Sequence, residues 1–314
     1  MKRIGTGLAA VVVMAAAVLP GARVMADDNR NGHYVNGVEG IKGATLPPPG
    51  LYARLYNVFY TADKLTDGNG DEITSVPGPG GAIPVDFEVQ VLAFVPRLIW
   101  ISDFKLLGGN YGADILVPLL YTDVELDPVL EDDAWGFGDM YVEPLLLAWH
   151  GARWDAAFGL SMYIPTGDYD ADEPASPGKD MWTLMTTLGG TVYLDEAKTW
   201  SASILGRYET HSERDETDVQ YGDEFHFEWG IGKTVAKFVD VGLAGYCQWQ
   251  VTDDSGDDVV WDAGEHDQVF AVGPEVLVFM PKAGLFASLR SEWEFEAKDR
   301  PEGNVTVLTL TKIL

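Results

Sequence analysis

The most constraining feature of this sequence is an alternation of apolar and polar side chains with a period of two, which recurs along almost the whole chain. Between positions 199 and 211 the even positions include Trp200 and Ile204. The odd positions of the same segment include Arg207 and Glu209. Successive side chains of a β-strand point to opposite faces, so this alternation predicts strands with one oily and one charged face.

The alternation predicts twelve strands, each long enough for the ~9 to 11 tilted residues that cross a bilayer. The predicted strands are centred near 50–61, 85–96, 111–121, 138–149, 154–164, 181–194, 199–211, 224–236, 239–252, 268–280, 285–297 and 305–314. Bacterial single-chain outer-membrane barrels have an even number of strands, and the predicted count fits that rule.

The connections between the predicted strands are alternately long and short. The long ones are 62–84, 122–137, 165–180, 212–223, 253–267 and 298–304, and they hold more than half of all Asp and Glu. The short ones lie near 97–110, 150–153, 195–198, 237–238 and 281–284. This pattern predicts an all-β transmembrane antiparallel up-and-down β-barrel with long acidic extracellular loops and short periplasmic turns. A soluble β-sandwich or lipocalin-type barrel, with its oily face inward, is the alternative.

The N-terminus has the features of a secretory signal peptide. Two basic residues precede an apolar run from Ile4 to Leu19, and Val24-Met25-Ala26, with small or modest side chains, comes directly before Asp27. The predicted division is a signal peptide at 1–26, a periplasmic N-terminal segment and possible plug at 27–49, and an outer-membrane barrel at 50–314. An uncleaved membrane anchor and a disordered lead-in are the respective alternatives for the first two parts.

Composition and charge exclude several classes of function. The formal net charge is −28, and removal of Lys2, Arg3 and Arg23 with the signal peptide changes it to about −31. Nucleic acid is therefore not an expected partner, because phosphate binding needs clustered Lys and Arg. No later stretch approaches the ~18 apolar residues of a transmembrane helix. Cys247 is the single cysteine, so neither an intrachain disulfide nor a thiolate metal cluster is possible.

Charged and polar side chains share the inward parity on several predicted strands. A Lys or Arg that faced lipid would be destabilising by ~2 to 4 kcal/mol at mid-depth, so these groups must point into the lumen. The lumen-facing candidates for a solute path are Glu143, Arg207, Glu209, His226, Glu228, Gln248, Glu275, Arg290, Glu292 and Glu294. An internal salt-bridge network that fills the lumen is the alternative role for each of them. A net acidic lining would favour cations or positively charged amphiphiles.

Two prolines lie inside predicted strands, each next to an acid. Pro144 follows Glu143, and Pro274 precedes Glu275. Because proline removes a donor from the sheet, both positions predict bulges or kinks. Such a defect in the wall could serve as a sideways exit for a greasy solute or simply curve the strand.

No catalytic residue, resident metal or cofactor is predicted. His211 and Ser212 form the only adjacent His–Ser pair, and neighbouring strand positions face opposite sides, which argues against a nucleophile–base contact. Weak candidates for divalent-cation binding are Asp253, Asp254, Asp257 and Asp258, for which a solvated loop is the alternative.

Several spaced elements resemble a known family. Gly136-Phe137-Gly138-Asp139 is followed by Glu143-Pro144, Trp149 and Pro165-Thr166-Gly167-Asp168-Tyr169, and later by Glu228-Trp229-Gly230. This series resembles the outer-membrane family associated with the meta-pathway of phenol degradation. The resemblance implies a barrel channel for uptake of hydrophobic or aromatic compounds, with one branch linked to long-chain sphingoid bases.

These observations lead to one functional prediction and one alternative. The prediction is a bacterial outer-membrane channel, not an enzyme, that takes up hydrophobic or amphipathic small molecules by passive diffusion. Its expected partners are outer-membrane lipid, lipopolysaccharide and the solute. The alternative is a structural or surface-interaction barrel with a closed lumen and cation-binding acidic loops.

Overall fold

The structure, a computed structural model, describes residues 32–314, and every regular element in that range is a β-strand. The predicted signal peptide and positions 27–31 lie outside the described residues. The strands are β1 (Gly50–Leu65), β2 (Ser75–Gly78), β3 (Gly81–Pro84), β4 (Asp86–Leu106), β5 (Gly109–Leu116), β6 (Leu119–Asp127), β7 (Leu130–Phe137), β8 (Met140–His150), β9 (Trp154–Ile164), β10 (Thr183–Tyr193), β11 (Trp200–His211), β12 (Glu224–Ala236), β13 (Val239–Gln250), β14 (Gln268–Met280), β15 (Leu285–Lys298) and β16 (Pro301–Ile313). Within residues 32–314, no helix is long and apolar enough to cross a membrane.

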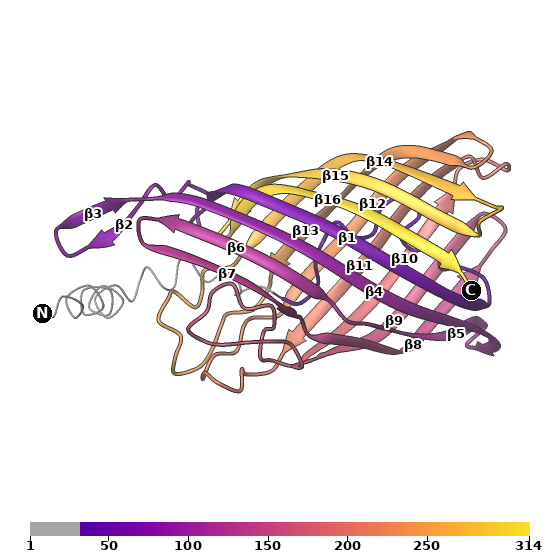
Figure 1. Cartoon of the computed structure of the whole chain (residues 1–314). Coiled ribbons are helices and arrows are strands. Elements are labelled where there is room, and N and C mark those ends of the chain that lie inside the picture. The colour runs from indigo at the N-terminus through magenta and orange to yellow at the C-terminus, as the bar shows by residue number, and fades with distance from the viewer. Residues whose placement is uncertain (1–31) are drawn as a thin grey trace, which may run out of the picture.

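The strands close into an antiparallel barrel. Fourteen of them form one sheet in the order β1-β16-β15-β14-β13-β12-β11-β10-β9-β8-β5-β4-β6-β7, and β1 also pairs with β4. β5 and β6 follow one another as two parts of one wall-spanning strand, here called a stave, and β7 and β8 form another. Each of the other ten strands is a stave by itself. The wall therefore has twelve staves, the number of strands that the sequence predicts. The tilted staves are visible in Figure 1.

The oily face of the wall points outward. On β11, Ile204 is 52% exposed whereas Glu209 is fully buried. On β12 the aromatic side chains of Phe225 and Phe227 lie on the outer face with Trp249 of β13. The alternation therefore distinguishes lipid-facing from lumen-facing positions as predicted, and the soluble alternative, with these aromatic residues in its core, is wrong.

The two ends of the barrel differ. One end, here called the loop end, carries the long connections 165–182, 212–223 and 251–267 and the β2–β3 hairpin. The other, the turn end, has short connections such as 107–108 and 237–238. Figure 1 shows the C-terminus at the turn end, away from the β2–β3 hairpin.

Three predicted connections are wrong. Positions 122–137 form most of the β6–β7 hairpin, which is paired from Leu119–Phe137 to Leu126–Leu130. Positions 298–304 are largely strand, since β15 ends at Lys298 and β16 begins at Pro301. Likewise, β4 continues to Leu106, so the turn that follows it is much shorter than 97–110. The high density of acids hid the alternation in 122–137, where Val124 and Leu126 are buried against the outer parts of β1 and β4.

Residues 32–45 lie inside the barrel and span most of its length. Near the loop end, the Gly32 N–H donates to Glu224 on β12. Near the turn end, Lys42 pairs with Asp240 at the start of β13, at 2.6 Å. The chain then enters β1 at Gly50. The segment expected at the periplasmic mouth thus occupies the lumen itself.

Candidate functional site

Ion pairs between wall strands lie on the lumen side of the barrel. Arg207 on β11 contacts Glu228 on β12 with 2.6 Å between Nη1 and Oε2. Arg290 on β15 contacts Glu275 on β14 at 3.0 Å. These side chains are at most 5% exposed. A buried charge is stable only when paired and hydrogen-bonded, and neighbouring strands supply those partners here.

A second group of charges gathers around Arg97 on β4. Its guanidinium donates two hydrogen bonds to Asp114 on β5, at 2.9 and 2.7 Å. It also reaches Glu143 on β8 at 3.3 Å. Three consecutive staves are therefore tied together on the lumen side.

The outer part of the inserted segment, residues 32–34, is held by two buried carboxylates. The backbone N–H groups of His33 and Tyr34 donate to Glu209, at 3.0 and 3.1 Å. The Gly32 N–H donates to Glu224 at 2.5 Å. Charge-assisted hydrogen bonds of this kind are stronger than neutral ones, so the contact fixes the segment to β11 and β12.

The middle of the segment contacts the ion pairs of the wall. The Tyr34 hydroxyl donates to Glu228 at 2.7 Å, and the Arg207 guanidinium lies 3.8 Å from the centre of the Tyr34 ring. Glu39 pairs with Arg54 of β1 at 2.8 Å. The segment is thus a member of the lumen network and not a loosely packed insert.

The inner part of the segment is anchored by both backbone and side chains. The Ile41 N–H donates to Glu275 at 2.6 Å, and the Ala44 N–H donates to the Ser203 hydroxyl at 3.1 Å. The Thr45 hydroxyl donates to Asp155 at 3.1 Å. Together with the outer contacts, these bonds join residues 32–45 to strands on several sides of the lumen.

The ten predicted lumen residues all lie on the inward face. Nine are at most 5% exposed: Glu143, Arg207, Glu209, His226, Glu228, Gln248, Glu275, Arg290 and Glu292. Glu294 is half-buried and accepts hydrogen bonds from the Tyr60 and Tyr246 hydroxyls. Their part in a solute path stays a prediction. The observed contacts are those of an internal network, the alternative considered for each of them.

Sequence reasoning missed several members of this network. Arg97 was assigned to a short turn, and Glu39 belongs to a segment without strand periodicity. Asp114 lies on β5, where its inward parity could have identified it. In the sequence, Asp139 stands out only as part of a family motif.

The barrel wall changes character at Gly138 and Asp139, which separate β7 from β8. β9 pairs with β8 up to the Met140–Ile164 pair, and β7 pairs with β6 alone. On this side of β7 the connection 165–182 takes the place of a neighbouring strand. We call this region the wall junction.

Asp139 organises the wall junction. Its carboxylate accepts backbone hydrogen bonds from Thr166 and Gly167, at 3.0 and 2.8 Å, and from Lys179, at 2.8 Å. The Asp168 N–H donates to the Phe137 carbonyl oxygen at 2.8 Å. The two motif segments 136–139 and 165–169 are therefore hydrogen-bonded to each other.

Glycine permits the close approach of the backbones at the junction. A Cβ atom on Gly167 would lie 2.7 Å from the Cα of Gly178 and 2.8 Å from the carbonyl carbon of Gly138. Real Cβ atoms do not come so close to backbone. The glycines of the motif thus have a packing role.

His33 connects the inserted segment to the wall junction. Its Nε2 lies 2.8 Å from Asp139 Oδ2, and its Nδ1 lies 2.6 Å from the Thr183 hydroxyl. The ring stacks on Tyr163 with 4.7 Å between centroids. A displacement of the segment would consequently disturb Asp139 and the connection that it holds.

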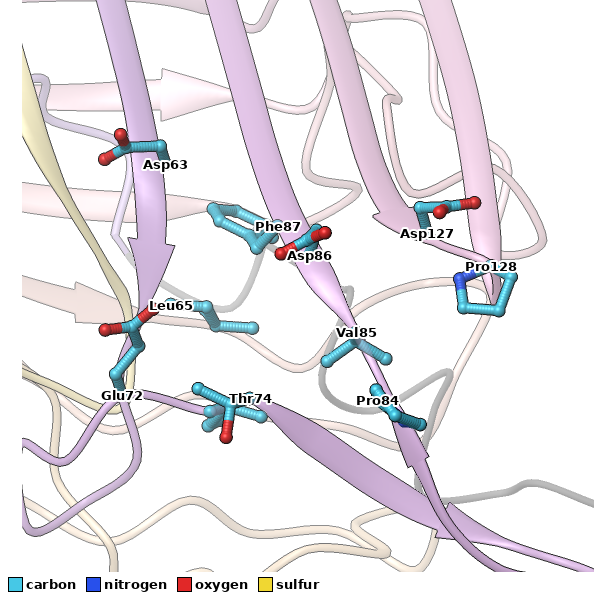
Figure 2. A pocket seen from close by; sticks show the side chains of 11 residues that line it. Asp63, Leu65, Glu72, Thr74, Pro84, Val85, Asp86, Phe87, Asp127 and Pro128 are labelled. Carbon is cyan, nitrogen blue, oxygen red and sulfur yellow. The ribbon is translucent and has the colours of Figure 1, made fainter.

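A surface pocket of about 410 Å³ lies at the loop end (Figure 2). Its apolar part is formed by Leu65, Val85 and Phe87, which belong to a buried cluster at the outer ends of β1, β4 and β6. Acids also line it: Asp63, Glu72, Asp86 and Asp127. The pocket combines an oily surface with negative charge.

The two strand prolines behave differently. The pairing of β8 with β9 shifts register between Val142 and Leu145, as the bulge predicted at Pro144 requires. The pairing of β14 with β15 omits positions 273–274 but keeps one register from the Val272–Trp293 pair to the Glu275–Arg290 pair, so Pro274 forms no bulge there, and a kink at this position stays a prediction. A sideways exit at either proline stays a prediction.

The His–Ser pair does not form a nucleophile–base contact. His211 Nδ1 lies 2.7 Å from the Thr183 hydroxyl. The Ser212 hydroxyl donates to the Glu213 carbonyl oxygen at 2.8 Å and accepts from the Trp182 N–H. The two side chains thus have separate partners.

The acidic loop 253–258 uses some of its carboxylates in local contacts. Asp254 accepts hydrogen bonds from the Gly222 N–H and the Trp261 indole, at 2.8 and 2.7 Å. Asp258 accepts from the Asp218 N–H at 2.9 Å. Cation binding by Asp253, Asp254, Asp257 and Asp258 stays a prediction.

Comparison with known proteins identifies the family. The sequence profile of the family described as "Putative MetA-pathway of phenol degradation" matches residues 62–310. The chain belongs to this family. The predicted resemblance is confirmed. The match includes the wall junction and every wall strand from β4 to β15 in full, together with the end of β1 and most of β16. No curated protein sequence matches the chain.

Comparison with solved structures finds one with the same fold as this family member and others that are less similar. An outer-membrane channel from Pseudomonas putida F1 superposes with a TM-score of 0.74 at 14% identity, covering 90% of this chain and 100% of that one. The transport unit of the autotransporter AIDA-I from Escherichia coli has a TM-score of 0.49 at 10% identity, covering 93% and 96%. A Pseudomonas aeruginosa FadL homologue has a TM-score of 0.37 at 10% identity, covering 84% and 89%. The closed barrel with its oily outer surface is a bacterial outer-membrane fold.

Proposed function

We propose that this family member is a channel that admits hydrophobic or amphipathic small molecules across the outer membrane by passive diffusion. The observation that carries the proposal is the wall junction beside an occupied lumen. Residues 32–45 are bonded to the wall along the lumen, so they narrow any straight aqueous path through it. At Gly138 and Asp139, however, the wall is held by a connection and not by a neighbouring strand, which is a weaker barrier to a greasy solute.

The pocket at the loop end supports a preference among solutes. An apolar surface favours an alkyl or aromatic group, whereas Asp63, Glu72, Asp86 and Asp127 favour a positive charge on the same molecule. We therefore propose that amphiphiles with a cationic head group enter more readily than anionic ones of the same chain length. Lipopolysaccharide and outer-membrane lipid are the proposed surroundings of the barrel.

Permeation into vesicles tests the proposal. Purified protein is inserted into vesicles whose outer leaflet contains lipopolysaccharide, and the entry of matched neutral, cationic and anionic amphiphiles is followed. Uptake above that of protein-free vesicles, fastest for the cationic compound, is expected. Asp139→Ala should increase uptake, because it releases three backbone contacts of the 165–182 connection; Asp195→Ala, at the turn end, should not. Uptake equal to that of empty vesicles for every compound contradicts a channel.

The dense contacts of residues 32–45 also favour a second candidate function. A barrel whose lumen is permanently filled would act as a structural or surface-interaction protein, with its acidic loops outside. Failure of both wild-type protein and Asp139→Ala to admit any solute, with folding intact, would support this alternative.

A further inference from the structure

Three titratable side chains meet on the lumen side of β11 and β12. Glu209 and Glu224 face each other across the two strands, and His226 follows Glu224 by two residues on the same face. All three are buried, and one potential ligand atom from each lies within 4.8 Å of the others. The cluster sits where residues 32–34 are attached.

His226 has an unusual environment. Its side chain is fully buried, and neither ring nitrogen has a hydrogen-bond partner among residues 32–314. Nε2 lies 4.0 Å from Glu209 Oε1, which is too far for a hydrogen bond. Tyr34 stacks on the ring at 5.0 Å between centroids and contributes no polar partner. A buried imidazole without partners is unfavourable, and neutral imidazole is a good metal ligand.

The two carboxylates keep capacity for a cation. Glu209 accepts hydrogen bonds from His33 and Tyr34, and Glu224 accepts from Gly32 and from Gln248. A carboxylate offers about four lone-pair sites, so two accepted bonds do not saturate it. Arg207, which is close by, directs its hydrogen bond to Glu228 instead. An ion between Glu209 and Glu224 would offset their mutual repulsion.

We propose that Glu209, Glu224 and His226 bind one divalent transition-metal ion, with Zn²⁺ the best match to this donor set. Zn²⁺ takes imidazole nitrogen and carboxylate oxygen at ~2.0 to 2.2 Å, and three protein ligands leave a position for water. Ca²⁺ and Mg²⁺ prefer oxygen ligands alone. The ligand atoms lie within 4.8 Å of one another, and side-chain rotation would bring them closer around one ion.

The site has a consequence for the inserted segment. The carboxylates that bind the ion are those that accept the backbone N–H groups of Gly32, His33 and Tyr34. A bound ion orients both carboxylates and so fixes the outer part of the segment to β11 and β12. This inference does not depend on the proposed transport function.

Metal binding by the full-length protein tests the inference. The protein is purified in detergent with a tag that contains no histidine, stripped with a chelator, and refolded with Zn²⁺ or Co²⁺. Wild-type protein should retain about one equivalent of Zn²⁺ after gel filtration. The Co²⁺ form should show the visible absorption of a low-coordinate nitrogen and oxygen site. Zn²⁺ should also slow amide exchange at residues 32–34.

Substitution of the ligands distinguishes a specific metal site from nonspecific ion binding by the acidic side chains. His226→Asn should weaken Zn²⁺ binding by about 100-fold or more, since loss of even an outer-shell partner costs about 10- to 100-fold. Glu224→Gln, which keeps an acceptor for the Gly32 N–H, should do the same. Glu292→Gln is the matched control, because it removes another buried lumen carboxylate whose oxygens have no partner among the described residues.

Each outcome decides the question. Loss of Zn²⁺ in His226→Asn or Glu224→Gln, with retention in Glu292→Gln and unchanged heat-modifiable mobility on gels, supports the site. Absence of Zn²⁺ from wild-type protein overturns it. Equal binding in wild type and both ligand variants, as expected for ions held by the acidic loops, also overturns it, as does an equal loss in Glu292→Gln.

Discussion

The wall from β9 to β16 and the wall from β4 to β8 are held together in different ways. In the first region, strands pair with their neighbours over most of their length, and inward charges such as Arg290 and Glu275 pair across adjacent strands. In the second, two staves are interrupted, at 117–118 and at 138–139. Asp139 and Gly167 there replace strand pairing with side-chain and close backbone contacts.

The difference indicates where the wall of such a barrel can open. A regular wall distributes its hydrogen bonds over many equivalent pairs, so no single backbone contact decides its integrity. An interrupted wall concentrates them on few groups, and here those groups also contact the inserted segment through His33. The interrupted region is therefore the place where a local change can open the wall.

The largest expected effect is in the regular region, from Arg290→Met. The change leaves Glu275 buried without its ion-pair partner and removes the donor to the Gly37 carbonyl oxygen. Breaking a buried pair typically lowers stability by about 3 to 5 kcal/mol. Urea unfolding in detergent measures the loss. The double variant Arg290→Met/Glu275→Met should recover part of it, and a loss below about 1 kcal/mol would show that the lumen pairs do not stabilise this region.

In the interrupted region, Asp139→Ala should lower stability by about 3 kcal/mol, because several backbone donors lose a shared charged acceptor. The same change should expose the 165–182 connection to proteases. Limited proteolysis with mapping of the cleavage sites measures this. Asp170→Ala is the control, since Asp170 Oδ1 accepts from the Asp172 N–H in the same connection. Equal cleavage of both variants would contradict a special role for Asp139.

Gly167→Ala compares the interrupted wall with the regular wall by adding one atom, the Cβ. The new Cβ would overlap the backbone of Gly178 and Gly138, and overpacking of this kind lowers stability by about 2 kcal/mol. Gly190→Ala in the regular wall is the matched control, since its Cβ would meet only the Asp155 carbonyl oxygen, at 3.5 Å. Thermal unfolding of both variants measures the difference. Equal melting temperatures would show that the junction tolerates a side chain.

The smallest expected effect is at the turn end and depends on pH. A hydrogen bond from the Trp200 N–H, with a further one from the Thr199 hydroxyl, holds the pKa of Asp195 below its ordinary value. A lowered pKa means that the stabilisation is present above the ordinary pKa of Asp, about 3.9, and is lost as the pH falls through the lowered value. Amide exchange at Trp200 should therefore increase at low pH, and Asp195→Asn should remove this dependence. The same pH profile in both proteins would contradict the assignment.

Much of the fold could be predicted from local pattern. Alternation along 199–211 and 224–236 identified both strands and their faces, because lipid excludes charge from one face of every stave. The prediction failed at 122–137, where acids alternate with apolar residues at the loop end and composition suggested a loop. At Pro274 the bulge, one of the two predicted outcomes, is absent, because loss of one donor does not require an extra residue in the strand.

The candidate site was less predictable. The alternation of apolar and polar residues placed Glu209 and His226 on the lumen side. It did not predict which other side chains they would contact. The inserted segment has no strand periodicity, and its partners are remote in sequence: Gly32 and Glu224 are 192 positions apart. The motif at 136–139 and 165–169 resembles that of a known family. Its physical basis is the close contact of its glycines and the hydrogen bonds from three N–H groups to Asp139, and both are properties of the tertiary structure.

The sequence by itself determined the class of fold, the faces of the strands and the location in a bacterial outer membrane. It could do so because the bilayer excludes charge from the lipid-facing side of each stave independently. Only the tertiary structure decided how the inward charges pair, that residues 32–45 lie in the lumen, and that Glu209, Glu224 and His226 meet. Those features depend on closure of the ring, which brings strands distant in sequence around one enclosed space where buried charges are stabilised by pairing.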